Sequence, residues 1–237
     1  MALGWLIVVV ALAFTVEAAL GFGATVIAVA LGAFLWPIDE LLSAFVPVNV
    51  LLSGLVVARA WRHLRLDVLG LRILPWMGLG FPLGAWLAAV IDPSTGKRGF
   101  GALMIALAAL DLTGRVLHPR GVGANTTLVA AGVVHGLFAT GGPLAVWVTA
   151  GLLPDKDAFR ATMSLLWLVF NVLLLSTWAW TGRLTATSLT TSAVLLLPLL
   201  VGLGAGEQIH RRLDPVTFRR GVFAGIGLAG LILLIRG

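Results

Sequence analysis

The sequence contains no cysteine and no tyrosine, and only 11% of its 237 residues are charged. The absence of cysteine excludes disulfides, thiolate metal sites and a cysteine nucleophile. A soluble domain of this size needs many more charged residues to cover its surface. No polar stretch is long enough for a separate soluble domain, and the mean hydropathy is +1.05. These absences indicate an integral membrane protein.

Continuous apolar runs approach 20 residues, the length that crosses a bilayer as a helix. Strands of a membrane barrel would alternate in polarity instead. The sequence therefore predicts an all-α polytopic membrane protein. Its net charge of +6 comes from arginines in short loops, which indicates orientation against anionic membrane lipids. We expect no nucleic-acid partner and no cofactor.

An internal repeat divides the chain. The pattern Asp-Pro-x-Thr-x-(Lys/Arg)-Arg-Gly begins at Asp92 and again at Asp214, 122 residues later. The same offset relates other pairs: Gly80 and Gly202, Gly84 and Gly206, and Asn49 and Asn171. We interpret 1–118 and 119–237 as two repeats of about four transmembrane helices each, within one membrane domain. Many secondary transporters are built this way, with the substrate site between the repeats.

Each repeat is expected to open with a broken helix. The predicted helices are 2–20, 24–35, 40–60, 68–91, 98–117, 122–139, 143–153, 157–180, 186–210 and 216–236. Two of them, 24–35 and 143–153, are shorter than a bilayer crossing, and each follows a glycine-rich stretch. Such breaks occur at membrane depth only where they line a cavity or are buried in protein.

The distribution of lysine and arginine distinguishes two topologies. If each broken segment is one long crossing, the two sides carry eight basic residues each. If each broken segment re-enters and returns to its own side, the split is 12 to 4, as the positive-inside rule requires. This count favours inverted repeats with both termini outside the cytoplasm.

Two ionisable residues precede the two breaks at equivalent positions. Glu17 and His135 lie within apolar segments, 118 residues apart, shortly before Gly21 and Gly141. Charges at membrane depth are costly and usually face a cavity or a partner. A carboxylate and an imidazole at one site can bind and release protons together with an anion. A buried pair with a purely structural role is the alternative.

The breaks themselves are candidate anion sites. Glycines there let backbone N–H groups turn toward an anion, and the helices that follow begin near Thr25 and Pro143. Helix N-termini carry partial positive charge that suits sulfonate, sulfite or carboxylate groups. The alternative is that the glycines only permit close helix packing. The expected binding residues at the breaks are Gly21, Gly23, Thr25, Thr140, Gly141 and Gly142.

Further polar residues have two interpretations each. Asn49 and Asn171 are mid-helix amides that either donate to substrate oxygens or join neighbouring helices. Arg160 begins a helix, and we expect it to extend to lipid phosphates rather than to bind an anion. Glu207 is either an ordinary helix-end partner of the basic residues beside it or a gate.

These patterns resemble the TauE/SafE sulfite exporter family of bacterial membrane transporters. The resemblance rests on the glycine motif 21–24, on Gly136-x-x-x-Thr140-Gly141-Gly142-Pro143, on the arginine-rich stretch before Asp67, and on the repeated Asp-Pro motif. It implies export of sulfur-containing anions such as sulfite or sulfonates, linked to the proton gradient.

The leading hypothesis is thus a secondary transporter in the bacterial inner membrane, with a small anion and protons as its partners. Alternatives are a transporter or channel for another anion such as a carboxylate, an intramembrane enzyme, and a scaffold. The sequence carries no recognisable catalytic motif, so no enzyme activity is expected. A homodimer is left open.

Overall fold

The computed structural model describes residues 2–112, 119–153 and 155–212, and this part of the chain is helical throughout, without strands. The helices of the first half are α1 (Ala2–Leu20), α2 (Ala24–Gly32), α3 (Ile38–Ala60), α4 (Leu66–Val68), α5 (Leu74–Val90) and α6 (Pro93–Leu112). Those of the second half are α7 (Val122–Phe138), α8 (Gly142–Leu152), α9 (Lys156–Trp180), α10 (Ala186–Val194) and α11 (Leu196–Arg212). A 3-10 turn, η1 (Trp61–His63), follows α3, and a π-helical turn, η2 (Leu69–Ile73), precedes α5.

Several described helices have the length and composition of membrane spans. Four qualify by themselves, namely Ala2–Leu20, Ile38–His63, Leu66–Val90 and Lys156–Trp180. The bent pair α10–α11 adds a fifth, while α7 and α8 are shorter apolar helices. The prediction of an all-α polytopic membrane protein is confirmed.

Most helix boundaries agree with the predicted ones, but the expectation of one helix over 186–210 is wrong. The chain bends by 41° between α10 and α11, at Leu195. Pro198 explains the bend, because it has no N–H to donate to the carbonyl of Val194. The second copy of the Asp-Pro motif and the predicted helix 216–236 lie outside the described residues.

The described copy of the Asp-Pro motif is a helix start. Asp92 Oδ1 accepts hydrogen bonds from the backbone N–H groups of Ser94 and Thr95, both at 3.0 Å, and from Ser94 Oγ at 2.7 Å. Pro93 is the first residue of α6, where its missing N–H is tolerated. The hydroxyl and amide donors hold the pKa of Asp92 below its usual range.

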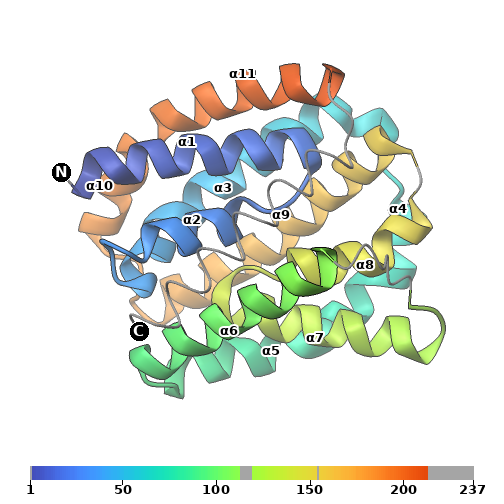
Figure 1. The fold of residues 1–237 in the computed structure, drawn as a ribbon, viewed down its shortest axis with the longest axis horizontal. Coiled ribbons are helices and arrows are strands. Elements are labelled where there is room, and N and C mark those ends of the chain that lie inside the picture. The colour runs from blue at the N-terminus through green and yellow to red at the C-terminus, as the bar shows by residue number, and fades with distance from the viewer. Residues whose placement is uncertain (1, 113–118, 154, 213–237) are drawn as a thin grey trace.

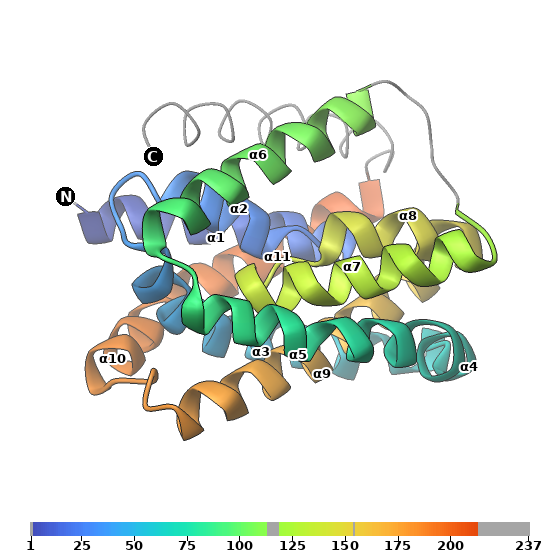
Figure 2. The ribbon, with the colours of Figure 1, turned by 90° about the horizontal axis from the view of Figure 1, so that it is seen from below.

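The two halves pack against each other reciprocally. Helix α1 lies along α11, its counterpart α7 lies along α5, and α3 packs on α9 between them (Figures 1 and 2). Helix α5 approaches α7 through Gly80 and Gly84, where an added Cβ would overlap backbone carbonyl oxygens of α7. Helix α11 approaches α1 through Gly202 and Gly206 in the same way. These four glycines therefore serve close helix packing.

The contacted residues give the correspondence between the halves. Gly84 and Gly206 are equivalent at an offset of 122 residues. Gly84 contacts Val133 and Gly206 contacts Thr15, and these two contacted residues are 118 positions apart. Residues of α3 and α5 therefore match α9 and α11 at offset 122, whereas residues of α1 match α7 at offset 118. The orientation of the two halves relative to a membrane stays a prediction.

The break after α1 reverses the chain. Trp5 Nε1 donates to the carbonyl of Leu31 at 3.0 Å, and Trp36 Nε1 donates to the carbonyl of Ala2 at 3.2 Å. The end of α2 thus returns to the start of α1, and the two helices form a hairpin (Figure 1). Helices α7 and α8 also pack on each other across the second break.

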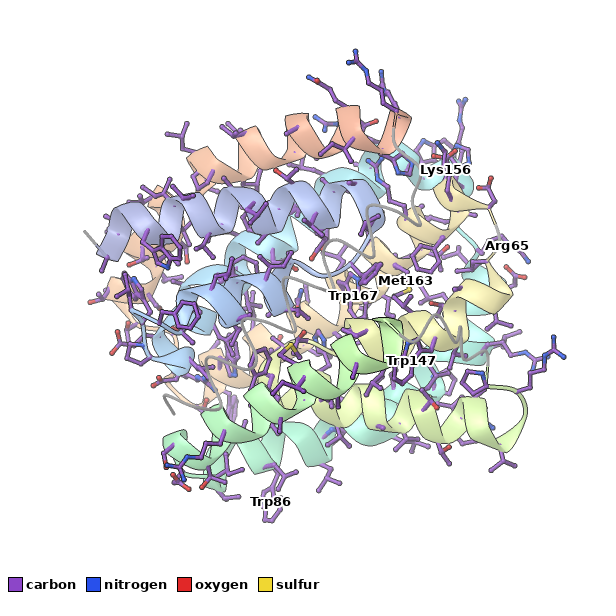
Figure 3. All side chains as sticks on the ribbon, viewed as in Figure 1. Arg65, Trp86, Trp147, Lys156, Met163 and Trp167 are labelled. Atoms are coloured by element: carbon purple, nitrogen blue, oxygen red, sulfur yellow. The ribbon has the colours of Figure 1, made fainter. Side chains whose placement is uncertain are left out.

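The bundle has two ends of different charge. At the first, which we call the basic end, α3 finishes, α9 begins and α11 finishes, joined by Arg65 N–H to Thr162 Oγ1 (3.1 Å) and Lys156 Nζ to the His210 carbonyl (3.2 Å). Figure 3 shows Arg65 and Lys156 at this end. The other end, which we call the opposite end, holds the starts of α3 and α6 and the ends of α5 and α9.

Candidate functional site

The first break is held open by glycine conformations and by α9. Gly21 and Gly23 have φ of 82° and 103°, in the left-handed region that favours glycine. A Cβ on Gly21 would lie 2.8 Å from the Cα of Arg160, so α9 packs directly on this backbone. Trp167 Nε1 donates to the Gly21 carbonyl at 2.8 Å. Trp167 lies in the interior between the helices (Figure 3) and fixes the turn from the second half of the chain.

Glu17 is buried beside this break and accepts three hydrogen bonds. Its Oε2 accepts from the backbone N–H of Ala24 at 3.2 Å, at the N-terminus of α2. Its Oε1 accepts from Asn49 Nδ2 at 3.0 Å and from Ser53 Oγ at 3.4 Å. The carboxylate therefore occupies a helix N-terminus of the kind that the sequence assigned to a bound anion.

The second break repeats this arrangement with an imidazole. Ala139, the counterpart of Gly21, has φ of 55° although it is not a glycine. The backbone N–H of Gly141 donates to His135 Nδ1 at 3.4 Å, as Ala24 donates to Glu17. The ring of His135 stacks on Trp167, with centroids 5.6 Å apart and planes 15° apart. One tryptophan thus contacts both breaks.

The two halves meet through a hydrogen bond between equivalent residues. Asn171 Nδ2 donates to Asn49 Oδ1 at 2.7 Å, and both amides are buried. Because Asn49 in turn donates to Glu17, a chain of donors runs from Asn171 to the carboxylate. His135 Nδ1 accepts from Gly141, so the neutral ring carries its proton on Nε2.

Polar atoms without partners gather at the same place. Within the described part of the chain, the buried atoms His135 Nε2, Thr140 Oγ1 and Asn171 Oδ1 have no hydrogen-bond partner. Buried polar atoms are nearly always paired, so such a group indicates a missing water or ligand. These residues line a cavity of about 10 Å³ together with Glu17 and Trp167. That volume holds about one water molecule.

The cavity brings together eight of the ten predicted site residues: Glu17, Gly23, Thr25, Asn49, His135, Thr140, Gly142 and Asn171. The other two, Gly21 and Gly141, contact it through Trp167 and His135. Trp167 and Ser53 also belong to the site, although neither was predicted from the sequence. Both lie one helical turn from an asparagine of the site, at 171 and 49, and this spacing was the available signal.

A larger cavity of about 870 Å³ lies at the opposite end. Its lining includes Ile38, Leu42, Ala85 and Phe138, with Arg183 near its rim. The guanidinium of Arg183 lies 4.6 Å from the ring centroid of Trp178. Phe138 immediately precedes Ala139, which lines the small cavity, so the two cavities approach each other at the second break.

The expectation that Arg160 extends to lipid phosphates is wrong. Its side chain is buried, and Nη2 bonds Glu207 Oε2 at 2.6 Å. Packing of its backbone against Gly21 draws the residue inward, where it needs a carboxylate partner. Glu207 also accepts from Arg211 Nη2 at 3.4 Å.

Comparison with known protein families assigns the chain. The family described as "Sulfite exporter TauE/SafE" matches residues 6–233, nearly the whole sequence. Comparisons with curated proteins and with solved structures give no match. The family is one of membrane transporters for sulfite and related sulfur anions, and not of enzymes. With its apolar helices and two broken segments, the chain belongs to the TauE/SafE sulfite exporter family.

Proposed function

We propose that this protein is a secondary transporter that exports a small sulfur oxyanion, such as sulfite or a sulfonate, and couples its movement to protons. The substrate binds between the two breaks, where Glu17, Asn49, Asn171 and His135 meet. The observation that carries the proposal is the position of Glu17 on the N-terminus of α2. At this position, the Glu17 carboxylate accepts hydrogen bonds from groups that could also donate to a substrate anion.

Competition for these donors links the proton to the anion. While Glu17 is ionised, it accepts from Ala24 and Asn49 and repels a second anion. Protonation removes that charge, and the substrate can then accept from the backbone N–H of Ala24 at the N-terminus of α2. The proton and the anion consequently bind together and cross the membrane in the same direction. Export is then driven by the outward concentration gradient of the anion, whereas an acidic exterior drives the pair inward.

The asparagine pair extends the coupling to the second break. A protonated Glu17 donates its proton to an amide oxygen, so Asn49 turns over and then offers its Nδ2 to Asn171. Asn171 turns over in its turn and donates to His135 Nε2. To accept this bond at Nε2, His135 must carry its proton on Nδ1. A proton on Nδ1 would face the N–H of Gly141, which now donates to that nitrogen. Protonation at the first break therefore loosens the second.

The charge distribution supports an orientation. The basic end carries Arg62, Arg65, Arg211 and Arg212, whereas Arg98 and Arg183 lie at the opposite end. By the positive-inside rule, the basic end faces the cytoplasm. The start of α1 then lies outside, and α7, which begins near the basic end, runs the other way (Figure 1). The two halves are inverted in a bacterial inner membrane.

Uptake into proteoliposomes tests the proposal. With an acidic exterior, wild type should accumulate sulfite or a sulfonate above the level reached without a gradient. Asn171→Leu, which breaks the amide pair, should abolish the accumulation. Ser176→Ala, an exposed position on the same helix, should leave it unchanged. Accumulation of carboxylates but of no sulfur anion would assign a different substrate, and equal uptake by Asn171→Leu would place the site elsewhere.

A further inference from the structure

An ion pair and a hydrogen bond join helices at the basic end, above the first break. Arg160 of α9 bonds Glu207 of α11 at 2.6 Å, and Asp157 of α9 bonds His210 of α11 at 2.8 Å. His210 Nδ1 also lies 2.7 Å from the carbonyl oxygen of Ala19, near the end of α1. These contacts join the start of α9 to α11 and α1, directly over the Gly21 turn.

The counterparts of these residues line the open cavity at the opposite end. Offset 122 relates the α9–α11 contacts to residues of the first half, and offset 118 relates Ala19 to Leu137. All the counterparts line the cavity of about 870 Å³. The corresponding pairs are Arg160 and Ile38, Glu207 and Ala85, Asp157 and Leu35, and His210 and Ala88. Small or apolar residues leave a cavity at one end, and larger residues joined by polar contacts fill its counterpart at the other.

Unpartnered polar atoms lead inward from the ion pair. Arg160 Nε, Ser164 Oγ and Asn171 Oδ1 are buried without partners. With Trp167 they fall at i, i+4, i+7 and i+11, on one face of α9. At 1.5 Å per residue this face extends for about 16 Å, from the end of the bundle to its middle. The counterparts of Arg160 and Ser164 in α3 are Ile38 and Leu42, so the polar face occurs in one half only.

We propose that Arg160 and Ser164 form a second oxyanion site, on the cytoplasmic face, and that the substrate enters it by replacing Glu207 on Arg160. The proposal rests on the transport function proposed above. A guanidinium binds sulfonate or sulfite oxygens as it binds a carboxylate, with donors to spare at Nε, and the Ser164 hydroxyl supplies another donor. Glu207 retains Arg211 as a partner when it leaves Arg160. When Arg160 and Glu207 separate, a cavity opens at the basic end, in the position equivalent to the cavity of about 870 Å³ at the opposite end.

Cysteine labelling tests whether the ion pair closes a cavity, and the native chain has no cysteine to interfere. Purified Ser164→Cys in nanodiscs is exposed to a membrane-impermeant maleimide in sulfite-free buffer. Labelling should be slow, and about tenfold faster when Glu207→Gln replaces the carboxylate partner of Arg160 with a neutral amide. Ala85→Cys in the open cavity is the matched control and should label rapidly in both backgrounds. Equal labelling of Ser164→Cys with and without Glu207→Gln would overturn the closure.

Charge exchange tests whether Arg160 binds the anion. The double variant Arg160→Glu with Glu207→Arg keeps an ion pair but moves the positive charge to α11. If Arg160 only forms an ion pair with Glu207 and binds no anion, the double variant should bind sulfite like wild type. That result would refute the site. We expect unchanged melting without sulfite, slow Ser164→Cys labelling, and loss of the sulfite-induced rise in melting temperature. Arg160→Lys, which keeps the charge, should retain part of that rise and covers the case in which the double variant does not fold.

The failures of the two proposals are distinguishable. If sulfite and the sulfonates neither stabilise nor are transported by wild type, the proposed substrate is wrong. The labelling contrast between Ser164→Cys and Ala85→Cys needs no substrate, and it still reports whether Arg160 and Glu207 close a cavity.

Discussion

Replacing Glu17 by glutamine separates the charge of this residue from its shape. Two effects on the free energy of unfolding nearly cancel. In the glutamine variant Ala24 donates to the amide oxygen, and the amide Nε2 donates to Ser53 and to Asn49, which has turned over. Three neutral hydrogen bonds then replace the three charged ones at 3.2, 3.4 and 3.0 Å, and each weakens by about 1 kcal/mol. Against this loss, the protein no longer buries a charge at membrane depth, which costs about 3 kcal/mol. We expect Glu17→Gln to lie within about 1 kcal/mol of wild type.

Glu17→Ala is the matched variant. It leaves the donors of Ala24 and Asn49 unpaired in a closed site, at about 1–3 kcal/mol each. For a chain of this size, 1 kcal/mol corresponds to about 2–4 °C in melting temperature. Glu17→Gln should thus melt within about 4 °C of wild type. Glu17→Ala should melt about 4–24 °C below Glu17→Gln, because neither variant buries the charge and only the alanine leaves the two donors unpaired.

Transport gives the decisive measurement for Glu17. In proteoliposomes with an acidic exterior, wild type should concentrate the anion, whereas Glu17→Gln should only equilibrate it, because glutamine binds no proton. Glu17→Gln also resembles the protonated state, so it should bind the anion at least as tightly as wild type. If Glu17→Gln responds to the gradient like wild type, Glu17 is structural and the proposed coupling is wrong.

Three further predictions test the packing, the orientation and the break. Gly84→Leu should lower the melting temperature strongly, because α5 and α7 touch through backbone at this position. Gly78→Leu, on an open face of α5, is the control and should not lower it. Equal melting temperatures of the two variants would contradict this packing. Single cysteines at Arg98 and Arg212 should label from opposite sides of intact cells, and labelling from one side would exclude inverted halves. Trp167→Phe keeps the ring and loses the indole donor to the first break, so it should cost about 1 kcal/mol and slow transport, with unchanged rates as the refuting result.

The internal repeat predicted the arrangement of the helices, because the residues that repeat are ones that the backbone requires at helix contacts and helix starts. Gly80 and Gly202 match because each lets one helix touch another through backbone, and no other residue fits there. Asp92 and Pro93 start a helix by local hydrogen bonding and a fixed φ, which depend on near neighbours only. Such features are local and periodic, so the sequence alone carries them.

The partners of the site residues were less predictable. Glu17 and His135 were identified from their depth in apolar segments, but not Glu17's place on the N-terminus of α2. That bond depends on the Gly21–Gly23 turn folding α2 back along α1, which the sequence left open. Arg160 was assigned to lipid because its position beside Gly21 and Glu207 is a long-range contact, 139 and 47 residues away in sequence.

Residues that obey the repeat and residues that break it have different roles here. Two identical halves related by a two-fold axis would give the inward-open and outward-open states equal free energy. Asn49 and Asn171 keep the repeat, since the same amide occupies equivalent positions and the two side chains bond each other, with Asn171 as the donor. Glu17 and His135 break it, so the donors between them point one way, toward the carboxylate. At the ends, Arg160 stands where Ile38 stands in the first half, so an ionic contact closes one face while the other stays open. In the proposed transport cycle, these departures from symmetry set which face is closed at rest, and they supply the charge differences through which a proton and an anion change it.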